Sequence, residues 1–114
     1  MNTVKLIGNV GSTPNIRNFE TKKLASFSLA TNQTYENNSN EKVKNTQWHN
    51  IVAWGKMAEV CEKIIEKGKF VAIEGRIQTR HFTNKENMKV YITEIIVTKV
   101  DEVVCENKTK VFFL

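Results

Sequence analysis

The sequence predicts an all-β domain, a five-stranded Greek-key barrel with one α-helix between the third and fourth strands. Short segments in which apolar and polar side chains alternate recur along the chain, as half-buried strands require. One segment alone has helical periodicity, and it follows the third strand-like segment. A chain of 114 residues, 40% of them hydrophobic, suffices for one small apolar core. We therefore expect one domain over residues 1–100 and a short C-terminal extension over residues 101–114.

Two strands are predicted in the N-terminal third of the chain. The first is Val4–Val10, and residues 11–23, rich in polar residues with one proline, read as a connection. The second covers residues 24–35, and the polar, Asn-rich residues 36–45 after it are predicted to form a mobile loop. Alternation in the second strand places three apolar side chains on one face: Ala25, Phe27 and Leu29.

The third strand, residues 46–54, carries both tryptophans of the chain. Side chains alternate along a strand, so Trp48 and Trp54 share one face with Asn50 and Val52. The other face carries His49, Ile51 and Ala53. A small barrel can fill its interior from only one face of each strand. We therefore place Ile51 and Ala53 inside and the tryptophans outside, against the alternative that the tryptophans are core residues.

A helix is predicted over residues 56–67. Its apolar side chains recur at i, i+3, i+4, i+7 and i+8 and form one stripe: Met57, Val60, Cys61, Ile64 and Ile65. Gly68 then supplies the expected C-terminal stop. Since Cys61 lies in the stripe and no metal-ligand spacing surrounds either cysteine, we expect a reduced, buried thiol there.

The last two strands, residues 70–82 and 90–99, are expected to form a hairpin joined by residues 83–89. Gly75 inside the first of them predicts a bulge or a bend. Alternation places Val71, Ile73 and Ile77 on one face and Arg76, Gln78, Arg80 and Phe82 on the other. Three strands, a helix and two further strands are the order of elements in the OB-fold.

Charge and aromatic placement together point to a nucleic-acid partner. The net charge is +5 and the pI is about 9.3, which suits a polyanion but also suits simple solubility. Aromatic side chains interleaved with Lys and Arg are what a groove for single strands needs, because bases stack and cations neutralise phosphates. We expect stacking residues at Tyr35, Trp48, Trp54 and Phe82, with Arg76 and Arg80 beside them.

Other functional classes find little support in the sequence. His49 and His81 have no nucleophile or carboxylate pair at a recognisable spacing, and there is no phosphate-binding glycine loop or zinc signature. Glu74 and Glu94 are expected to be structural salt-bridge partners. We expect no enzyme activity, cofactor or metal. Without a signal-like or membrane-length apolar run, we expect a cytoplasmic, nucleoid-associated protein.

In several stretches the sequence resembles the bacterial single-stranded DNA-binding proteins of replication and repair. These stretches run in family order along nearly the whole predicted barrel: Leu6-Ile7-Gly8-Asn9-Val10-Gly11, Phe27-Ser28-Leu29-Ala30-Thr31, Thr46-Gln47-Trp48-His49-Asn50-Ile51-Val52, Gly55-Lys56-Met57-Ala58-Glu59-Val60, Ile73-Glu74-Gly75-Arg76-Ile77 and Tyr91-Ile92-Thr93-Glu94-Ile95. Any one of them alone would be a weak signal, whereas together they are specific.

The resemblance implies an OB-fold that coats and protects single-stranded DNA in replication, recombination and repair. It places family stacking positions on the four aromatic residues named above, and phosphate contacts on Lys56, Lys67 and Arg80. It also implies a homotetramer, with subunit contacts at His49 and along the first strand at Val4 and Leu6. This sequence lacks the acidic tail by which the family recruits replication enzymes. Either the sequence is a shortened form or the protein recruits partners differently, and we expect poor tail-mediated recruitment by this chain.

Two rival functions remain open at this stage. The first is a primosomal accessory OB protein, a dimer that contacts a helicase through the same strand face. Its oligomeric state and its affinity for DNA alone would distinguish it. The second is a nuclease, which the lack of clustered carboxylates or metal ligands opposes.

Overall fold

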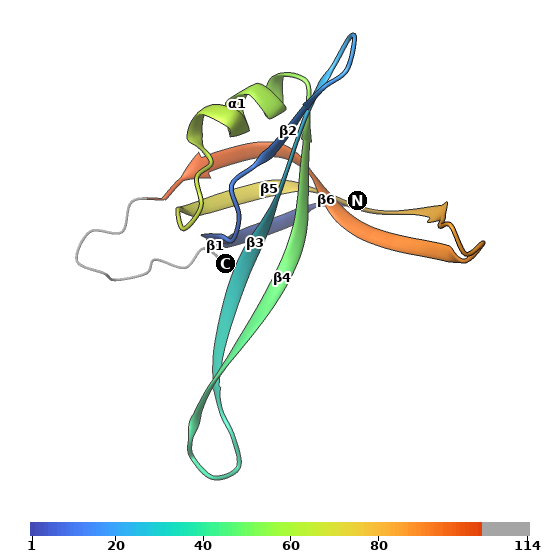
Figure 1. The fold of residues 1–114 in the computed structure, drawn as a ribbon. Coiled ribbons are helices and arrows are strands. Elements are labelled where there is room, and N and C mark those ends of the chain that lie inside the picture. Colours follow the sequence, from blue (N-terminus) through green and yellow to red (C-terminus); the bar gives the residue numbers. More distant parts are fainter. Residues whose placement is uncertain (104–114) are drawn as a thin grey trace.

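The computed structural model describes residues 1–103, which form six strands and one helix (Figure 1). The elements in chain order are β1 (Val4–Val10), β2 (Asn15–Asn18), β3 (Lys23–Glu36), β4 (Lys42–Trp54), α1 (Lys56–Ile64), β5 (Phe70–Thr83) and β6 (Lys89–Glu102).

Five of the strands close into a barrel. The order of hydrogen-bonded neighbours is β1-β5-β6-β4-β3, and β1 also pairs with β3, which joins the two ends. The pairings are antiparallel except for a short parallel contact between β4 and β6, where Ile51 lies opposite Ile95. The helix follows β4, the third barrel strand, so the predicted five-stranded barrel with its single helix is confirmed.

Alternating side chains fill the barrel interior as the sequence predicts. Ala25, Leu29 and Ile51 are completely buried, and Ile51 comes from the face of β4 opposite the tryptophans. Full burial of a leucine or isoleucine side chain such as Leu29 or Ile51 contributes about 1.5–3 kcal/mol. The core cluster also contains Val10, Phe27, Ala53, Ala58, Cys61, Ile65, Val71, Ile73, Ile95, Val97 and Val100.

Residues 11–23 contain a strand that the sequence did not predict. β2 pairs with the start of β3, with Ile16 opposite Ala25. In this four-residue strand only Ile16 is partly buried, so the alternation that marks a strand is too short to detect. β2 is held by its pairing with the edge of β3. Periodicity along the sequence gives no information on such a pairing.

Two hairpins extend beyond the barrel as arms, in different directions (Figure 1). The first arm is the distal part of β3 and β4, whose pairing continues to Glu36 and Lys42. The prediction of a loop over residues 36–45 was therefore wrong for residue 36 and for residues 42–45. The second arm is the distal part of β5 and β6, paired as far as Thr83 and Lys89. Residues 42–45 are mostly polar, so they lack the alternation of apolar and polar side chains from which the strands were predicted.

Both arms end in the same type of turn. In the first, Oδ1 of Asn37 accepts hydrogen bonds from the backbone N–H groups of Ser39 and Glu41. In the second, Oδ1 of Asn84 accepts from Glu86 and Met88. Asn40 and Asn87 hold the left-handed positions, with φ of 59° and 62°. Asparagine side chains suit both roles, which explains their number at the tips.

Helix α1 covers the barrel but ends three residues before the predicted end. Ile65 has an extended backbone, with φ −88° and ψ 122°, and is 3% exposed. Leaving the helix at this point lets the side chain of Ile65 enter the core. Val60 of the predicted apolar stripe is exposed instead of packed. Burial raises the pKa of the Cys61 thiol to about 11, as expected of a protonated core thiol.

Gly75 marks a bulge, as predicted. The pairing of β5 with β6 shifts between Glu74, opposite Lys99, and Gly75, opposite Val97. Beyond it, Ile77 is 47% exposed, although it lies on the strand face that Val71 and Ile73 bury in the core. The second arm leaves the barrel in this region. The face of β5 that packs on the core at Ile73 is therefore exposed at Ile77.

Candidate nucleic-acid interface

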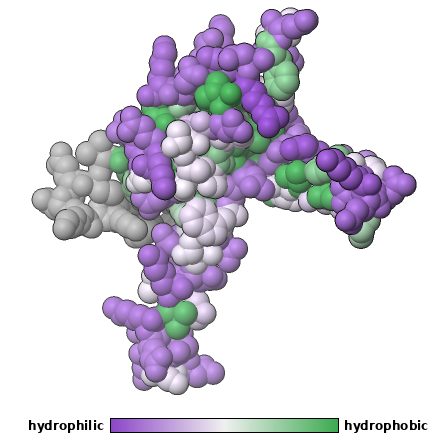
Figure 2. Space-filling view, in the orientation of Figure 1, coloured by the Kyte–Doolittle hydropathy of each residue, from purple (hydrophilic) through white to green (hydrophobic). Residues whose placement is uncertain are grey.

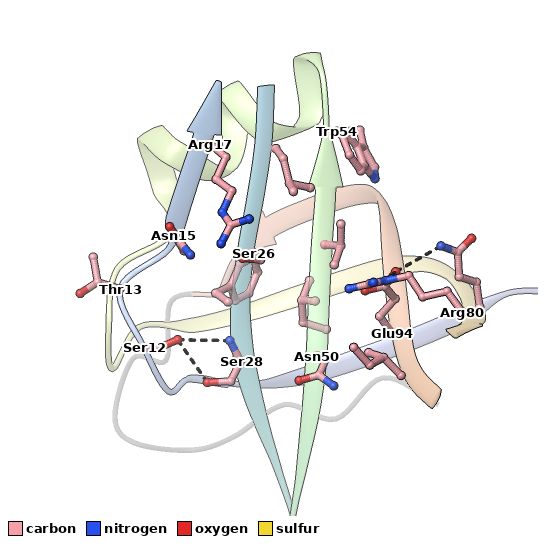
Figure 3. Close-up of a pocket in the computed structure, with 16 residues that line it drawn as sticks. Ser12, Thr13, Asn15, Arg17, Ser26, Ser28, Asn50, Trp54, Arg80 and Glu94 are labelled. Carbon is pink, nitrogen blue, oxygen red and sulfur yellow. Dashed lines mark hydrogen bonds and ion pairs between the residues drawn. The ribbon is translucent and has the colours of Figure 1, made fainter. Parts of the chain in front are cut away.

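A groove of about 920 Å³ crosses the outer face of the sheet (Figure 3). One wall comes from β2 and the loop before it, and the other from β5 and β6, while β3 and β4 form the floor. Its lining residues are Ser12, Thr13, Asn15, Arg17, Leu24, Ser26, Phe27, Ser28, Asn50, Ile51, Val52, Trp54, Gln78, Arg80, Ile92 and Glu94.

Trp54 borders this groove and forms an aromatic pair with Phe19. Its side chain is 43% exposed, and its ring stacks on that of Phe19, with centroids 6.1 Å apart and planes at 28°. Phe19 is itself 51% exposed and lies in the turn between β2 and β3, where its N–H donates to Lys22. Sequence reasoning missed Phe19, because residues 11–23 carried no strand signal to place it.

Trp48 is 63% exposed and lies on the same face of β4 as Trp54. Its indole packs on the backbone of Gly11, where a Cβ atom would lie 2.3 Å from Cζ3 of the ring. Glycine therefore leaves space for the ring to lie against the sheet. A smaller hollow of about 170 Å³ adjoins it, lined by Trp48, His49, Asn50, Ile77, Thr93, Glu94 and Ile95.

Phe82 continues the outer face of β5 into the second arm. It is 43% exposed and lies two residues beyond Arg80, so alternation puts both on the face that borders the groove. Arg76 lies on the same face and is exposed, but it does not line the groove. Figure 2 shows a surface of intermediate hydropathy between the two arms, with hydrophilic side chains around it.

Arg80 is joined to the one buried charged residue of the described chain. Its Nε lies 3.0 Å from Oε1 of Glu94, and Nε2 of Gln78 donates to the same oxygen over 3.2 Å. Glu94 is 5% exposed, whereas the side chain of Arg80 is 53% exposed. The salt-bridge role predicted for Glu94 is confirmed, and Glu74 likewise lies 4.0 Å from Lys5.

The remaining predicted contacts lie away from the groove. Tyr35 is 49% exposed near the tip of the first arm, opposite Val43. The β3 residues opposite Trp48 and Trp54 have even numbers, whereas Tyr35 has an odd number. Since side chains alternate along a strand, Tyr35 lies on the face of β3 opposite the tryptophans' face. Lys56 begins α1 just after Trp54, and Lys67 lies in the turn before β5; both are exposed.

The predicted subunit contacts lie on β1 and in the middle of β4. Val4 and Leu6 are partly buried against the core. Within residues 1–103, β1 pairs with β5 from Val4 onward but with β3 only at Asn9 and Val10, so much of its second edge has no strand partner. His49 is half-buried, and its Nε2 lies 2.8 Å from Oγ1 of Thr31. Burial lowers the pKa of His49 below its ordinary value.

Two kinds of feature are absent from residues 1–103. No cluster of three or more His, Cys, Asp or Glu side chains there is arranged to hold a metal ion. No helix in this part of the chain has the length and apolar character needed to cross a membrane.

Comparison with known sequences gives a consistent group of relatives. Residues 1–103 match the pattern of the single-strand binding protein family. The single-stranded DNA-binding protein 1 of Chlorobaculum tepidum is 42% identical over 100 residues, which cover 86% of this chain and 62% of the relative. The single-stranded DNA-binding protein of Bacteroides thetaiotaomicron is 38% identical over 104 residues, or 89% and 65% of the two chains. The chain thus spans less than two thirds of the length of these relatives.

Solved structures agree with this grouping. The Plasmodium falciparum SSB in complex with ssDNA superimposes with a TM-score of 0.81 at 34% identity, over 93% of this chain and 96% of that one. A deletion mutant of the single-stranded DNA binding protein from Thermus aquaticus gives a TM-score of 0.79, over 95% of this chain and 52% of that one. Its identity is only 22%, so that likeness concerns the fold alone.

Proposed function

This chain belongs to the single-strand binding protein family, and from that premise we propose that it binds single-stranded DNA without sequence preference. Its role is to coat and protect single strands during replication, recombination and repair, by binding and without catalysis. We propose that it acts at the nucleoid in the cytoplasm of a bacterium, and its bacterial relatives support the bacterial source.

The observation that carries this proposal is the exposure of large aromatic side chains along one groove-bearing face. Trp48, Trp54 and Phe82 are 63%, 43% and 43% exposed, although a monomer gains nothing from leaving such rings in water. Flat exposed rings are stacking surfaces for bases, and every base has a face to offer. Arg76, Lys56 and Lys67 are exposed outside the groove, where they can meet the phosphates of a longer strand. A contact at Tyr35 requires the strand to reach the opposite face of the first arm.

Titrating the protein with oligo-dT while following tryptophan emission tests the proposal. Trp48 and Trp54 are the only tryptophans, so stacking is expected to quench the emission strongly. Duplex DNA of the same length is the control and should leave the emission nearly unchanged. Because stacking adds a salt-insensitive part, binding should survive moderate salt, whereas loss of all binding there would contradict the role of the aromatic rings.

We further propose that the chain assembles as a homotetramer through β1 and the region around His49. The incompletely paired edge of β1 supports this, because exposed strand edges pair readily with a second copy. Light scattering at micromolar concentration should give four times the 13.1 kDa mass of the chain. A monomer or dimer mass under these conditions would contradict the assembly.

A further inference from the structure

The carboxylate of Glu94 lies in the wall of a groove that we propose binds a polyanion. Glu94 is the single buried charged residue among residues 1–103, and its neighbour Arg80 neutralises it across 3.0 Å. A phosphate placed here would gain from Arg80 but would be repelled by the carboxylate at nearly the same distance. The pair therefore offers little net attraction to a phosphate.

The same pair is well suited to a ligand that both donates and accepts hydrogen bonds. The contacts within residues 1–103 join Nε of Arg80 and Nε2 of Gln78 to Oε1 of Glu94. They leave the terminal amino groups of the guanidinium as donors and Oε2 of Glu94 as an acceptor. Figure 3 shows Glu94 and Arg80 side by side among the groove's lining residues.

We infer that Glu94 and Arg80 form a subsite for the Watson–Crick edge of an unpaired base, an inference that rests on the proposed function. Each of the four bases carries at least one donor and one acceptor on that edge, so the subsite accepts any of them. In a duplex these groups are already paired. The subsite thus favours single strands over duplex without reading sequence, and Arg80 contacts a base instead of the phosphate that the family resemblance implied.

The test compares oligo-dT with an oligonucleotide of N3-methylthymidine, which keeps the backbone and the stacking face but loses the edge donor. Wild-type protein is expected to bind the methylated strand about tenfold more weakly, equal to ~1.4 kcal/mol. Glu94→Met keeps a side chain of similar length without the acceptor, so its two affinities should be nearly equal. Glu74→Met is the matched control, since Glu74 is a strand carboxylate in an ion pair that does not line the groove, and it should keep the wild-type ratio.

The outcomes separate the subsite from the proposed function. If wild-type protein does not bind oligo-dT, the proposed function fails and the subsite falls with it. If it binds both strands equally, or if folded Glu94→Met keeps the wild-type ratio, the subsite is overturned while the proposed function stands. The wild-type comparison needs no variant, so it decides the matter even if Glu94→Met fails to fold.

Discussion

Replacing Trp48 and Trp54 together by alanine is expected to weaken the binding of oligo-dT by about a hundredfold. Each base stacked on an aromatic ring contributes roughly 1–3 kcal/mol by alanine substitution, and ~1.4 kcal/mol is a factor of ten. The rings share no partner, since Trp48 lies on Gly11 and Trp54 on Phe19, so their effects should add. Trp54→Ala alone should cost about tenfold or more, measured by the anisotropy of a labelled oligonucleotide.

Melting measurements on the same samples distinguish stacking from a role in the core. Because both rings are substantially exposed, the alanine variants should melt close to the wild-type temperature. Trp54→Phe keeps a flat ring and should lose much less affinity than Trp54→Ala. A Trp54→Ala protein that melts far lower yet binds oligo-dT normally would show that our assignment of this face is wrong.

Gly75→Ala is expected to destabilise the fold by about 1–3 kcal/mol, as inserting atoms into a close-packed site generally does. A Cβ atom on residue 75 would lie 2.1 Å from the carbonyl oxygen of Ile96 and 2.9 Å from its carbon. Both are backbone atoms of the neighbouring strand, so no side-chain rotation relieves the clash. Relief requires β5 and β6 to separate at the bulge, where the second arm departs.

Urea unfolding followed by circular dichroism measures this change in the free energy of unfolding. The control is Lys99→Ala on β6, whose side chain is 66% exposed and forms only a surface ion pair with Asp101. It should change stability by less than about 0.5 kcal/mol. Equal midpoints for Gly75→Ala and wild type would mean that the strands tolerate the added atom, contrary to the close approach seen here.

Local periodicity was enough to assign the inner and outer faces of the main strands. Alternation along β4 separated Ile51 and Ala53 from the two tryptophans, because a strand turns successive side chains to opposite faces wherever it lies in the fold. Helical spacing placed Cys61 in the core, and a lone glycine in an apolar strand indicated the bulge at Gly75. Each of these inferences depends on neighbours within a few positions of the chain.

Contacts between distant segments decided the rest. Phe19 meets Trp54 because β2 pairs with β3, and Arg80 meets Glu94 because β5 pairs with β6. The length of the arms, the early end of α1 at Ile64 and the exposure of Ile77 likewise follow from where the barrel ends in space. Spacing along the sequence determines which face a side chain takes, but strand pairing and closure of the barrel determine what lies opposite it. The residue types of the site were therefore readable in the sequence, whereas the groove and the Glu94–Arg80 pair in its wall exist only in the folded chain.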